Sequence, residues 1–309
     1  MKKVAIIGAG AMGSGIAQVA AMSGCEVILY DSFAASIVKA RDSILSSLNK
    51  LVEKNKFSDA EAKAIFGRIY FAEHLDSIAG CDLILEAIVE DESEKKNLFT
   101  KISSWIKADT IVASNTSSLS ITALAHHVPF PENFIGIHFF NPPVLMQLVE
   151  VIPSLQTASS VLEKIVREIK NWNKVAVIAK DTPGFLVNRI ARPYYGEAIR
   201  IVEEKLAFPE EVDASMKTFG GFRMGPFELM DFIGHDVNYA VTNSVWKAMF
   251  FDPRYKPSHT QTALVHAGWL GKKSGKGFYD YGDPTKSISG KSIEQHRFIF
   301  ERIFAMLAS

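Results

Sequence analysis

Short apolar runs alternate with helical patterns along the first part of the chain. Residues 2–7 form an apolar run that ends in Gly-Ala-Gly, residues 16–22 have the pattern of a helix, and residues 26–31 form a second apolar run. Strand, helix and strand in quick succession indicate the opening unit of a parallel sheet. The same pattern predicts further strands at 83–87, 110–113, 134–140, 148–152 and 175–178.

The segment between the second and third predicted strands is long and amphipathic. Apolar residues recur at helical spacing from Ile37 to Val52. Ser58, with Glu61 three residues later, is typical of a capping box that begins another helix. We therefore expect an antiparallel helical pair inserted into the α/β domain.

The sequence changes character at Asp181-Thr-Pro-Gly184, a turn-forming stretch that predicts a domain boundary. Beyond it, helical patterns cover residues 185–204, 209–219, 225–231 and 237–249. The fold class is therefore predicted as an α/β domain with an inserted helical pair over residues 1–180. An all-helical domain is predicted over residues 181–309.

A final amphipathic stretch, about residues 293–308, follows a polar linker and predicts an extra C-terminal helix. Phe298-Ile-Phe-Glu-Arg-Ile-Phe shares Phe, Arg and Ile with Phe185-Leu-Val-Asn-Arg-Ile-Ala at matching positions. The helix is either the start of an incomplete second copy, with Glu301 in the place of Asn188, or a simple terminal helix. On both interpretations its phenylalanines need a partner surface that shields them from water.

Composition narrows the function classes. Thirty-four basic residues balance thirty-four acidic ones, which is unlike the charge of a nucleic-acid binder. Two cysteines, Cys25 and Cys81, provide no disulfide framework, and no apolar run reaches membrane-spanning length. Lys2-Lys3 before an apolar run resembles a signal peptide, but glycines interrupt that run. A cytoplasmic protein without nucleic-acid or membrane partners is expected.

Gly8-Ala-Gly10-Ala11-Met12-Gly13 follows a predicted strand and opens a predicted helix. In that context G-x-G-x-x-G indicates a Rossmann-type dinucleotide site, with the pyrophosphate over the helix N-terminus. Asp31 ends the second strand, where a carboxylate accepts the ribose hydroxyls and repels a 2′-phosphate, which favours NAD over NADP. The alternative is a structural turn beside a solvated aspartate.

His138 and Glu150 both lie in apolar strands. A carboxylate in such a strand is costly unless it is paired, and a histidine on a neighbouring strand is the obvious partner. The pair would give a general base suited to neutral pH. An ordinary buried ion pair is the alternative that spacing alone leaves open.

Several longer motifs occur in order along residues 2–281. Beyond the glycine loop they are Glu86-Ala-Ile-Val-Glu90, Ser114-Asn-Thr-Ser-Ser-Leu119, His138-Phe-Phe-Asn-Pro142, Leu148-Val-Glu-Val151, Lys180-Asp-Thr-Pro-Gly-Phe-Leu-Val-Asn-Arg189, Met224-Gly-Pro-Phe-Glu-Leu-Met-Asp231 and Gly275-Lys-Gly-Phe-Tyr279. With these motifs the chain resembles the L-3-hydroxyacyl-CoA dehydrogenases.

The resemblance implies a role for each matching residue. His138 would be the base, oriented by Glu150, while Ser117 and Asn188 would hydrogen-bond the substrate. The cofactor contacts implied are the glycine loop, Asp31, Glu90, Lys95 and Asn115, although Glu90 and Lys95 also fit a solvated helix start. Ser47 and Lys54 would meet the CoA nucleotide, or simply form a charged helix face. No metal ligand is implied.

The function predicted is the NAD-dependent, reversible oxidation of (S)-3-hydroxyacyl-CoA to 3-oxoacyl-CoA, with a preference for short chains such as 3-hydroxybutyryl-CoA. The partner expected besides the acyl-CoA is a second copy of the chain, because the helical domain resembles the part that dimerises in the family. Two alternatives are a related dehydrogenase of a free hydroxy or sugar acid and a non-catalytic nucleotide-binding relative.

Overall fold

The structure is a computed structural model that describes residues 1–282 and 293–308. The chain divides into two compact units, Met1–Phe185 and Leu186–Ser309. The division falls a few residues beyond the turn at which the sequence predicts a boundary. Within the described ranges, no helix has both the length and the apolar character needed to cross a membrane.

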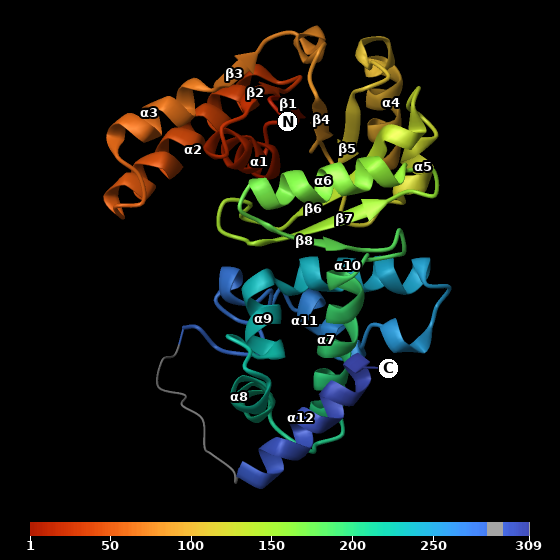
Figure 1. The fold of residues 1–309 in the computed structure, drawn as a ribbon. Coiled ribbons are helices and arrows are strands. Elements are labelled where there is room, and N and C mark those ends of the chain that lie inside the picture. Colours follow the sequence, from red (N-terminus) through yellow and green to blue (C-terminus); the bar gives the residue numbers. More distant parts are fainter. Residues whose placement is uncertain (283–292, 309) are drawn as a thin grey trace. The chain divides into compact units, whose positions relative to one another are not determined.

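The first unit is built on one eight-stranded sheet with the order β3-β2-β1-β4-β5-β6-β7-β8 (Figure 1). Neighbouring strands are parallel except β6 and β7, which pair antiparallel. The strands are β1 (Lys3–Ile7), β2 (Glu26–Tyr30), β3 (Ile69–Ala72), β4 (Leu83–Glu86), β5 (Ile111–Ser114), β6 (Phe134–Phe139), β7 (Leu148–Pro153) and β8 (Val175–Ile178).

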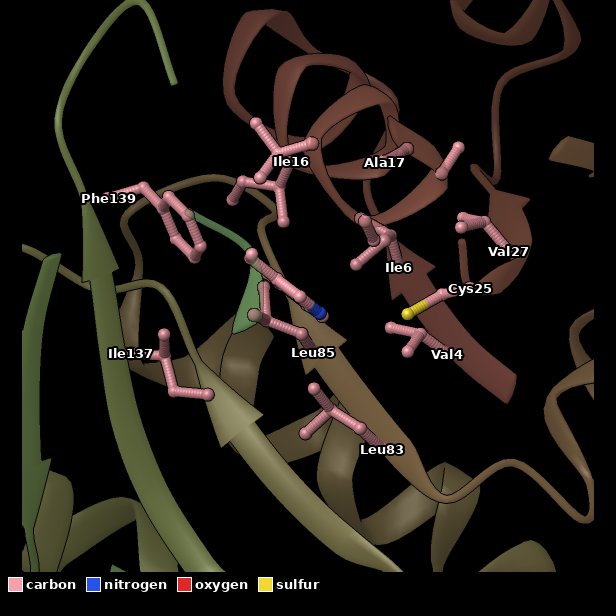
Figure 2. Packing of buried hydrophobic residues seen from close by; sticks show 14 of the residues in the cluster. Val4, Ile6, Ile16, Ala17, Cys25, Val27, Leu83, Leu85, Ile137 and Phe139 are labelled. Carbon is pink, nitrogen blue, oxygen red and sulfur yellow. The ribbon is translucent and has the colours of Figure 1, made fainter. Parts of the chain in front are cut away.

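Helices cover both faces of this sheet. The apolar core on one face includes side chains of α1 (Ala11–Met22), α2 (Ala34–Glu53), α3 (Asp59–Gly67) and α6 (Ser159–Asn171). The core on the other face includes side chains of α4 (Glu92–Ile102) and α5 (Ile121–Ala125). In β1, Val4 and Ile6 join the first core, shown in Figure 2, while Ala5 and Ile7 join the second. Burial on both faces explains why β1 and β4 to β7 are continuous apolar runs.

The predicted helical pair is confirmed as α2 and α3. The capping box is present, because the Ser58 hydroxyl accepts from Glu61 N–H and the Glu61 carboxylate accepts from Ser58 N–H. The sequence analysis missed β3, which has four residues and an exposed Tyr70. It also missed α6, whose apolar face packs on the first core.

The second unit is helical, as predicted. Its helices are α7 (Val187–Glu203), α8 (Pro209–Gly220), α9 (Pro226–Ile233), α10 (His235–Ala248), α11 (His259–His266) and α12 (Ile293–Ala308). The prediction that α7 begins at Phe185 is wrong by two residues. Gly184 and Phe185 both have positive φ angles, which a right-handed helix does not accommodate, and Phe185 is buried in the first unit.

The C-terminal helix α12 packs against α7 and α8 of its own unit. Ile299 and Ile303 are buried in the core that these helices share. Arg302 donates to both Glu197 and Glu204 of the α7 region. Phe300 packs against Phe219 in α8, so part of the aromatic face expected to need a surface is covered within the chain.

Candidate active site

The glycine loop lies between β1 and α1, where close packing dictates its residues. Gly8 has a φ of 107°, and a Cβ at Gly13 would lie 1.7 Å from the carbonyl oxygen of Gly8. Both positions therefore require glycine. Gly10 differs, because a Cβ there would meet nothing within 4 Å. The space next to Gly10 is open to an approaching ligand.

The start of α1 fits a pyrophosphate. Gly10 is the N-cap residue and no side chain caps this helix end, so its free N–H groups and its dipole favour an anion. Asp31, directly after β2, accepts from Ala9 N–H at 2.7 Å and from Phe33 N–H at 2.9 Å. A carboxylate has about four acceptor sites, so each oxygen can still accept a ribose hydroxyl. These residues fit a bound NAD.

His138 and Glu150 face each other across the antiparallel pair β6–β7. They are register partners, and His138 Nδ1 lies 2.6 Å from Glu150 Oε2. Glu150 is fully buried and His138 is 6% exposed. The ring of Phe140 lies 4.5 Å from the imidazole, centroid to centroid. The contact predicted from two polar residues in apolar strands is therefore present.

The Nδ1–Glu150 contact has a consequence for the other imidazole nitrogen. A carboxylate at Nδ1 favours a proton there, which leaves Nε2 as the acceptor in the neutral ring. Among the residues that the structure describes, none forms a hydrogen bond with Nε2. This nitrogen is therefore available to accept a proton.

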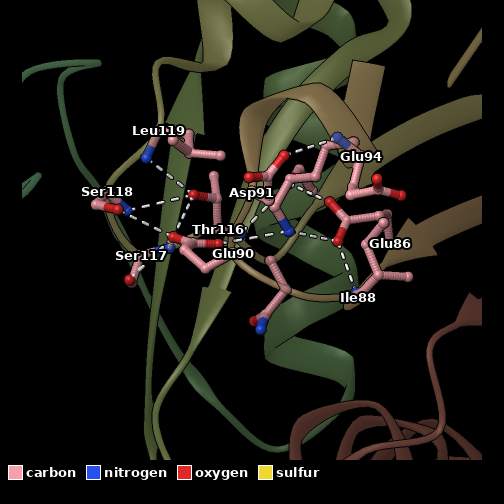
Figure 3. A network of polar contacts seen from close by, with 12 residues as sticks. Glu86, Ile88, Glu90, Asp91, Glu94, Thr116, Ser117, Ser118 and Leu119 are labelled. Atoms are coloured by element: carbon pink, nitrogen blue, oxygen red, sulfur yellow. Dashed lines mark hydrogen bonds and ion pairs between the residues drawn. The ribbon is translucent and has the colours of Figure 1, made fainter. Parts of the chain in front are cut away.

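Ser117 lies in the turn after β5 and is held by Glu90. One carboxylate oxygen of Glu90 accepts from the Ser117 N–H at 2.8 Å and from the Ser117 hydroxyl at 3.1 Å. The same oxygen accepts from the hydroxyls of Thr116 and Ser118. Figure 3 shows these hydroxyls gathered around Glu90. The sequence analysis proposed both residues separately, and the structure brings them together.

Lys95 is buried in this network. Its residue is 1% exposed, and its ammonium lies 2.5 Å from Glu86 and 3.4 Å from Glu90. Burial raises the pKa of Glu86, against the opposing effect of Lys95. For Glu90 the balance is reversed: burial opposes ionisation, but the Thr116 hydroxyl and Lys95 together hold its pKa below the usual range. Lys95 thus fixes a charged Glu90 beside Ser117.

Asn115 connects this turn to the histidine strand. Its side-chain oxygen accepts from Phe139 N–H at 2.8 Å, one residue after His138. The turn that contains Asn115 and Ser117, with Glu90 bound to it, therefore lies next to the strand that carries His138. Asn188, the remaining residue with a predicted substrate contact, lies in the first turn of α7 in the second unit and is half-buried.

Ser47 and Lys54 line a cavity of about 320 Å³ in the first unit. They project from α2 and its C-cap, and the opposite wall is formed by the start of α1 and the loop after β6. Lys50 and Asn141 are among the lining residues that were not singled out from the sequence. Lys50 lies four residues before Lys54, so the helical period already placed it on the same face.

Glu86 was also missed as a functional residue, although its motif was noted. It occupies the last position of β4, a strand in which every residue is buried. A carboxylate in an apolar strand is the same signal that singled out Glu150, and it predicts a buried partner. Asp181, in the predicted boundary turn, accepts from the N–H groups of Ile121 and Thr122 at the start of α5.

The chain has a mostly parallel sheet domain with a glycine-rich loop, followed by a helical unit. This combination places it in the class of two-domain dinucleotide-binding proteins. Residues 3–182 match the family described as "3-hydroxyacyl-CoA dehydrogenase, NAD binding domain". Residues 184–281 match "3-hydroxyacyl-CoA dehydrogenase, C-terminal domain". The chain belongs to the 3-hydroxyacyl-CoA dehydrogenase family, and the match confirms NAD as the expected cofactor.

Curated relatives align over most of this chain. It is 43% identical over 290 residues to a "3-hydroxyadipyl-CoA dehydrogenase" of Escherichia coli, covering 94% of this chain and 61% of that protein. It is 44% identical to a "Probable 3-hydroxybutyryl-CoA dehydrogenase" of Deinococcus radiodurans, covering 90% of this chain and all of that protein. The chain thus spans about three fifths of the length of the Escherichia coli relative.

Solved structures of the family have the same fold. A structure titled as 3-hydroxybutyryl-CoA dehydrogenase from Escherichia coli superposes with a TM-score of 0.91 at 43% identity, covering 94% of this chain and 62% of that one. The structure of (S)-3-hydroxybutyryl-CoA dehydrogenase from Ralstonia eutropha gives a TM-score of 0.87 at 38% identity, covering 92% of this chain and all of that one.

Proposed function

We propose that this protein catalyses the NAD-dependent, reversible oxidation of (S)-3-hydroxyacyl-CoA thioesters to 3-oxoacyl-CoA, including short chains such as 3-hydroxybutyryl-CoA. The observation that carries the proposal is the buried contact between His138 Nδ1 and Glu150, which leaves Nε2 as an acceptor. The names of the relatives support the substrate class, but they differ in the acyl group.

The residues divide the chemistry as follows. Bound NAD supplies the acceptor for the hydride that leaves C3. His138 Nε2 takes the proton of the 3-hydroxyl as the C3–O bond becomes a carbonyl. Glu150 keeps the imidazole in the Nδ1–H tautomer and stabilises the imidazolium that forms. Ser117 and Asn188 are assigned to hydrogen bonds with the reacting oxygen and the thioester.

The cofactor contacts are assigned to the glycine loop (Gly8, Gly10, Ala11, Met12 and Gly13), Asp31, Glu90 and Asn115. Lys95 is assigned a contribution through Glu90, because its ammonium is already paired with Glu86 and Glu90.

The CoA nucleotide is assigned to the cavity beside α2. Lys50 and Lys54 supply two flexible cations for its phosphates, and Ser47 supplies a hydroxyl. Pro142, Pro143 and Val144 supply an apolar wall. The proposal also includes a homodimer and a cytoplasmic location, which analytical ultracentrifugation and cell fractionation would test.

The test is a spectrophotometric assay of NADH formation with two substrates at equal concentration, (S)-3-hydroxybutyryl-CoA and free (S)-3-hydroxybutyrate. The proposal predicts turnover of the thioester and almost none of the free acid. Turnover of the free acid alone would instead indicate a dehydrogenase of free hydroxy acids. Absence of both reactions, in protein that binds NAD, would indicate a non-catalytic relative.

A further inference from the structure

A buried arginine in the helical unit is surrounded by neutral hydrogen-bond acceptors. Arg192 lies in α7 and is 5% exposed. Its hydrogen bonds go to the carbonyl oxygens of Asn188 and Asn238 and to the Thr242 hydroxyl, all neutral acceptors. Among the described side chains, those of residues 1–282 and 297–307, no carboxylate forms an ion pair with it. By contrast, the more exposed Arg200 and Arg302 each have a glutamate.

Such an arrangement is energetically unfavourable unless an anion completes it. A buried cation loses its hydration, and neutral acceptors replace only part of that stabilisation. Burial lowers the pKa of Arg192 to about 10, and the neighbouring Tyr195 phenol opposes this shift. At neutral pH the side chain remains a cation. The Tyr195 ring lies against the guanidinium, with the Arg192 Cζ 5.0 Å from its centroid.

A buried amide donor next to the arginine has no acceptor in the described structure. Asn238 is 1% exposed, and its side-chain oxygen accepts from Gln261 at 3.0 Å. Its Nδ2 is buried without a hydrogen-bond partner in the described structure. The backbone carbonyl of the same residue contacts Arg192, so the two groups are neighbours. Buried polar groups are rarely left unpaired, and here Asn238 Nδ2 lacks an acceptor beside a guanidinium that has only neutral acceptors.

The placement of Arg192 relates it to the substrate site. Asn188, assigned above to the thioester end of the substrate, lies one helical turn before Arg192. Residues four apart share a face of a helix, and one turn advances roughly 6 Å. A group a few bonds beyond the atoms that Asn188 binds is therefore at a distance suited to Arg192. The planar guanidinium is matched to a carboxylate, for which an amide N–H is a suitable second donor.

We propose that Arg192 and Asn238 bind a carboxylate at the far end of the acyl chain, so that the preferred substrates are CoA thioesters of 3-hydroxy dicarboxylic acids. This inference rests on the proposed function and specifies its substrate class. The names of the relatives differ in the acyl group. In this proposal, residues of the helical unit determine which acyl group is preferred.

The test compares two unreactive ligands of equal chain length, adipyl-CoA and hexanoyl-CoA, by calorimetry in the presence of NAD. They differ in a terminal carboxylate against a methyl group. A charge-assisted hydrogen bond is worth about 1.5–3 kcal/mol, so we expect adipyl-CoA to bind about tenfold more tightly or better. Free adipate should not bind at concentrations that saturate adipyl-CoA. Equal binding of the two thioesters, or tight binding of adipate alone, overturns the inference.

Three variants locate the preference. Arg192→Met should remove it by weakening adipyl-CoA alone, with hexanoyl-CoA unchanged within a few-fold. Arg200→Met, on the same helix but paired with Glu197 at the surface, is the matched control and should keep the preference. Asn238→Asp should also abolish it, because its carboxylate repels the ligand while giving Arg192 a counter-ion. That variant should keep or raise the melting temperature, which separates the effect from misfolding.

The outcomes distinguish the two proposals. If the protein oxidises (S)-3-hydroxybutyryl-CoA but binds both analogues equally, the substrate class is wrong and the proposed function stands. If no CoA thioester binds or reacts, both fail. If Arg192→Met still prefers adipyl-CoA, another residue binds the terminal carboxylate, and this inference is overturned.

Discussion

Two polar side chains in apolar strands carry the chemistry proposed here. The structure places His138 and Glu150 in register and in contact. The cost of burying a lone carboxylate made that contact predictable from sequence. The same reasoning applied to Glu86 would have found its partner Lys95. Arg192 could not be singled out from the sequence in this way. The observation that matters is that its described neighbours are neutral, and those neighbours are known only from the folded structure.

Replacing His138 with Gln tests the assignment of the base. The variant keeps a polar side chain but removes the proton acceptor, so kcat should fall by about 10²–10⁴-fold while the Kd for NAD changes little. Glu150→Gln should be nearly as damaging and should displace the pH–rate profile. The check is steady-state kinetics over a range of pH, and a kcat within a few-fold of wild type would contradict the role of His138.

Asp31 tests the choice of cofactor. Its carboxylate also anchors Ala9 N–H, so Asp31→Ala should both weaken NAD binding and relax the discrimination against NADP. The relevant quantity is the ratio of kcat/KM for NAD to that for NADP, in wild type and variant. A wild-type enzyme that favours NADP would refute the assignment whatever the variant does.

Asp213 gives a pH dependence with a definite sign. Burial raises its pKa to about 6, despite hydrogen bonds from Tyr279, Phe227 and Glu228. The folded protein therefore binds a proton that the unfolded chain releases, and this group's contribution to stability falls as pH rises from about 4 to 6. Asp213→Asn removes the titrating group. The melting temperature of the variant minus that of the wild type should therefore increase as pH rises from about 4 to 6. A constant difference, or one of opposite sign, would be inconsistent with this account.

At the scale of single elements, α12 is the feature that the sequence left most open. Its face with Ile299 and Ile303 is buried against α7 and α8, whereas Phe298 and Phe304 are more than half exposed. Glu301, the residue aligned with Asn188, pairs with Arg297 at the surface. The helix therefore forms part of the core of its own unit. Whether it begins an incomplete second copy stays a prediction.

The contribution of α12 to stability can be measured with one matched pair of variants. Ile303→Ala leaves a cavity in the core and should cost about 2–5 kcal/mol of unfolding free energy. Phe298→Ala, five residues earlier on the same helix, removes an exposed ring and should change stability by about 0.5 kcal/mol or less. Denaturant unfolding provides both values. Equal effects would mean that the helix does not pack as described.

Strands β1 and β4 to β7 were predicted well because burial on both faces makes them apolar runs, and this signal is local. Strand β3 was not predicted because it is short and exposes Tyr70. The start of α7 was misplaced because Phe185 continues the apolar pattern of the helix while its backbone takes a left-handed conformation. The antiparallel turn from β6 to β7 could not be predicted from periodicity, which is identical for both strand directions.

At the scale of the whole chain, each unit has its own core and its own share of the proposed chemistry. The first contains the cofactor loop, the histidine–glutamate pair and the α2 cavity. The second contains Asn188 and the buried Arg192, whose described hydrogen-bond acceptors are neutral. The proposed account therefore assigns hydride transfer to the first unit and the choice of acyl group to the second, which is why the variants above should affect separate parameters.

The central claim is direct hydride transfer from C3 of the thioester to NAD, with the hydroxyl proton taken by His138. It is tested most directly with (S)-3-hydroxybutyryl-CoA carrying deuterium at C3, followed by mass spectrometry of the reduced cofactor. We predict that NADH formed by the wild-type protein contains the deuterium, that the (R) enantiomer yields almost none, and that His138→Gln forms product far more slowly. Reduced cofactor without deuterium, or equal rates for wild type and His138→Gln, would contradict the account.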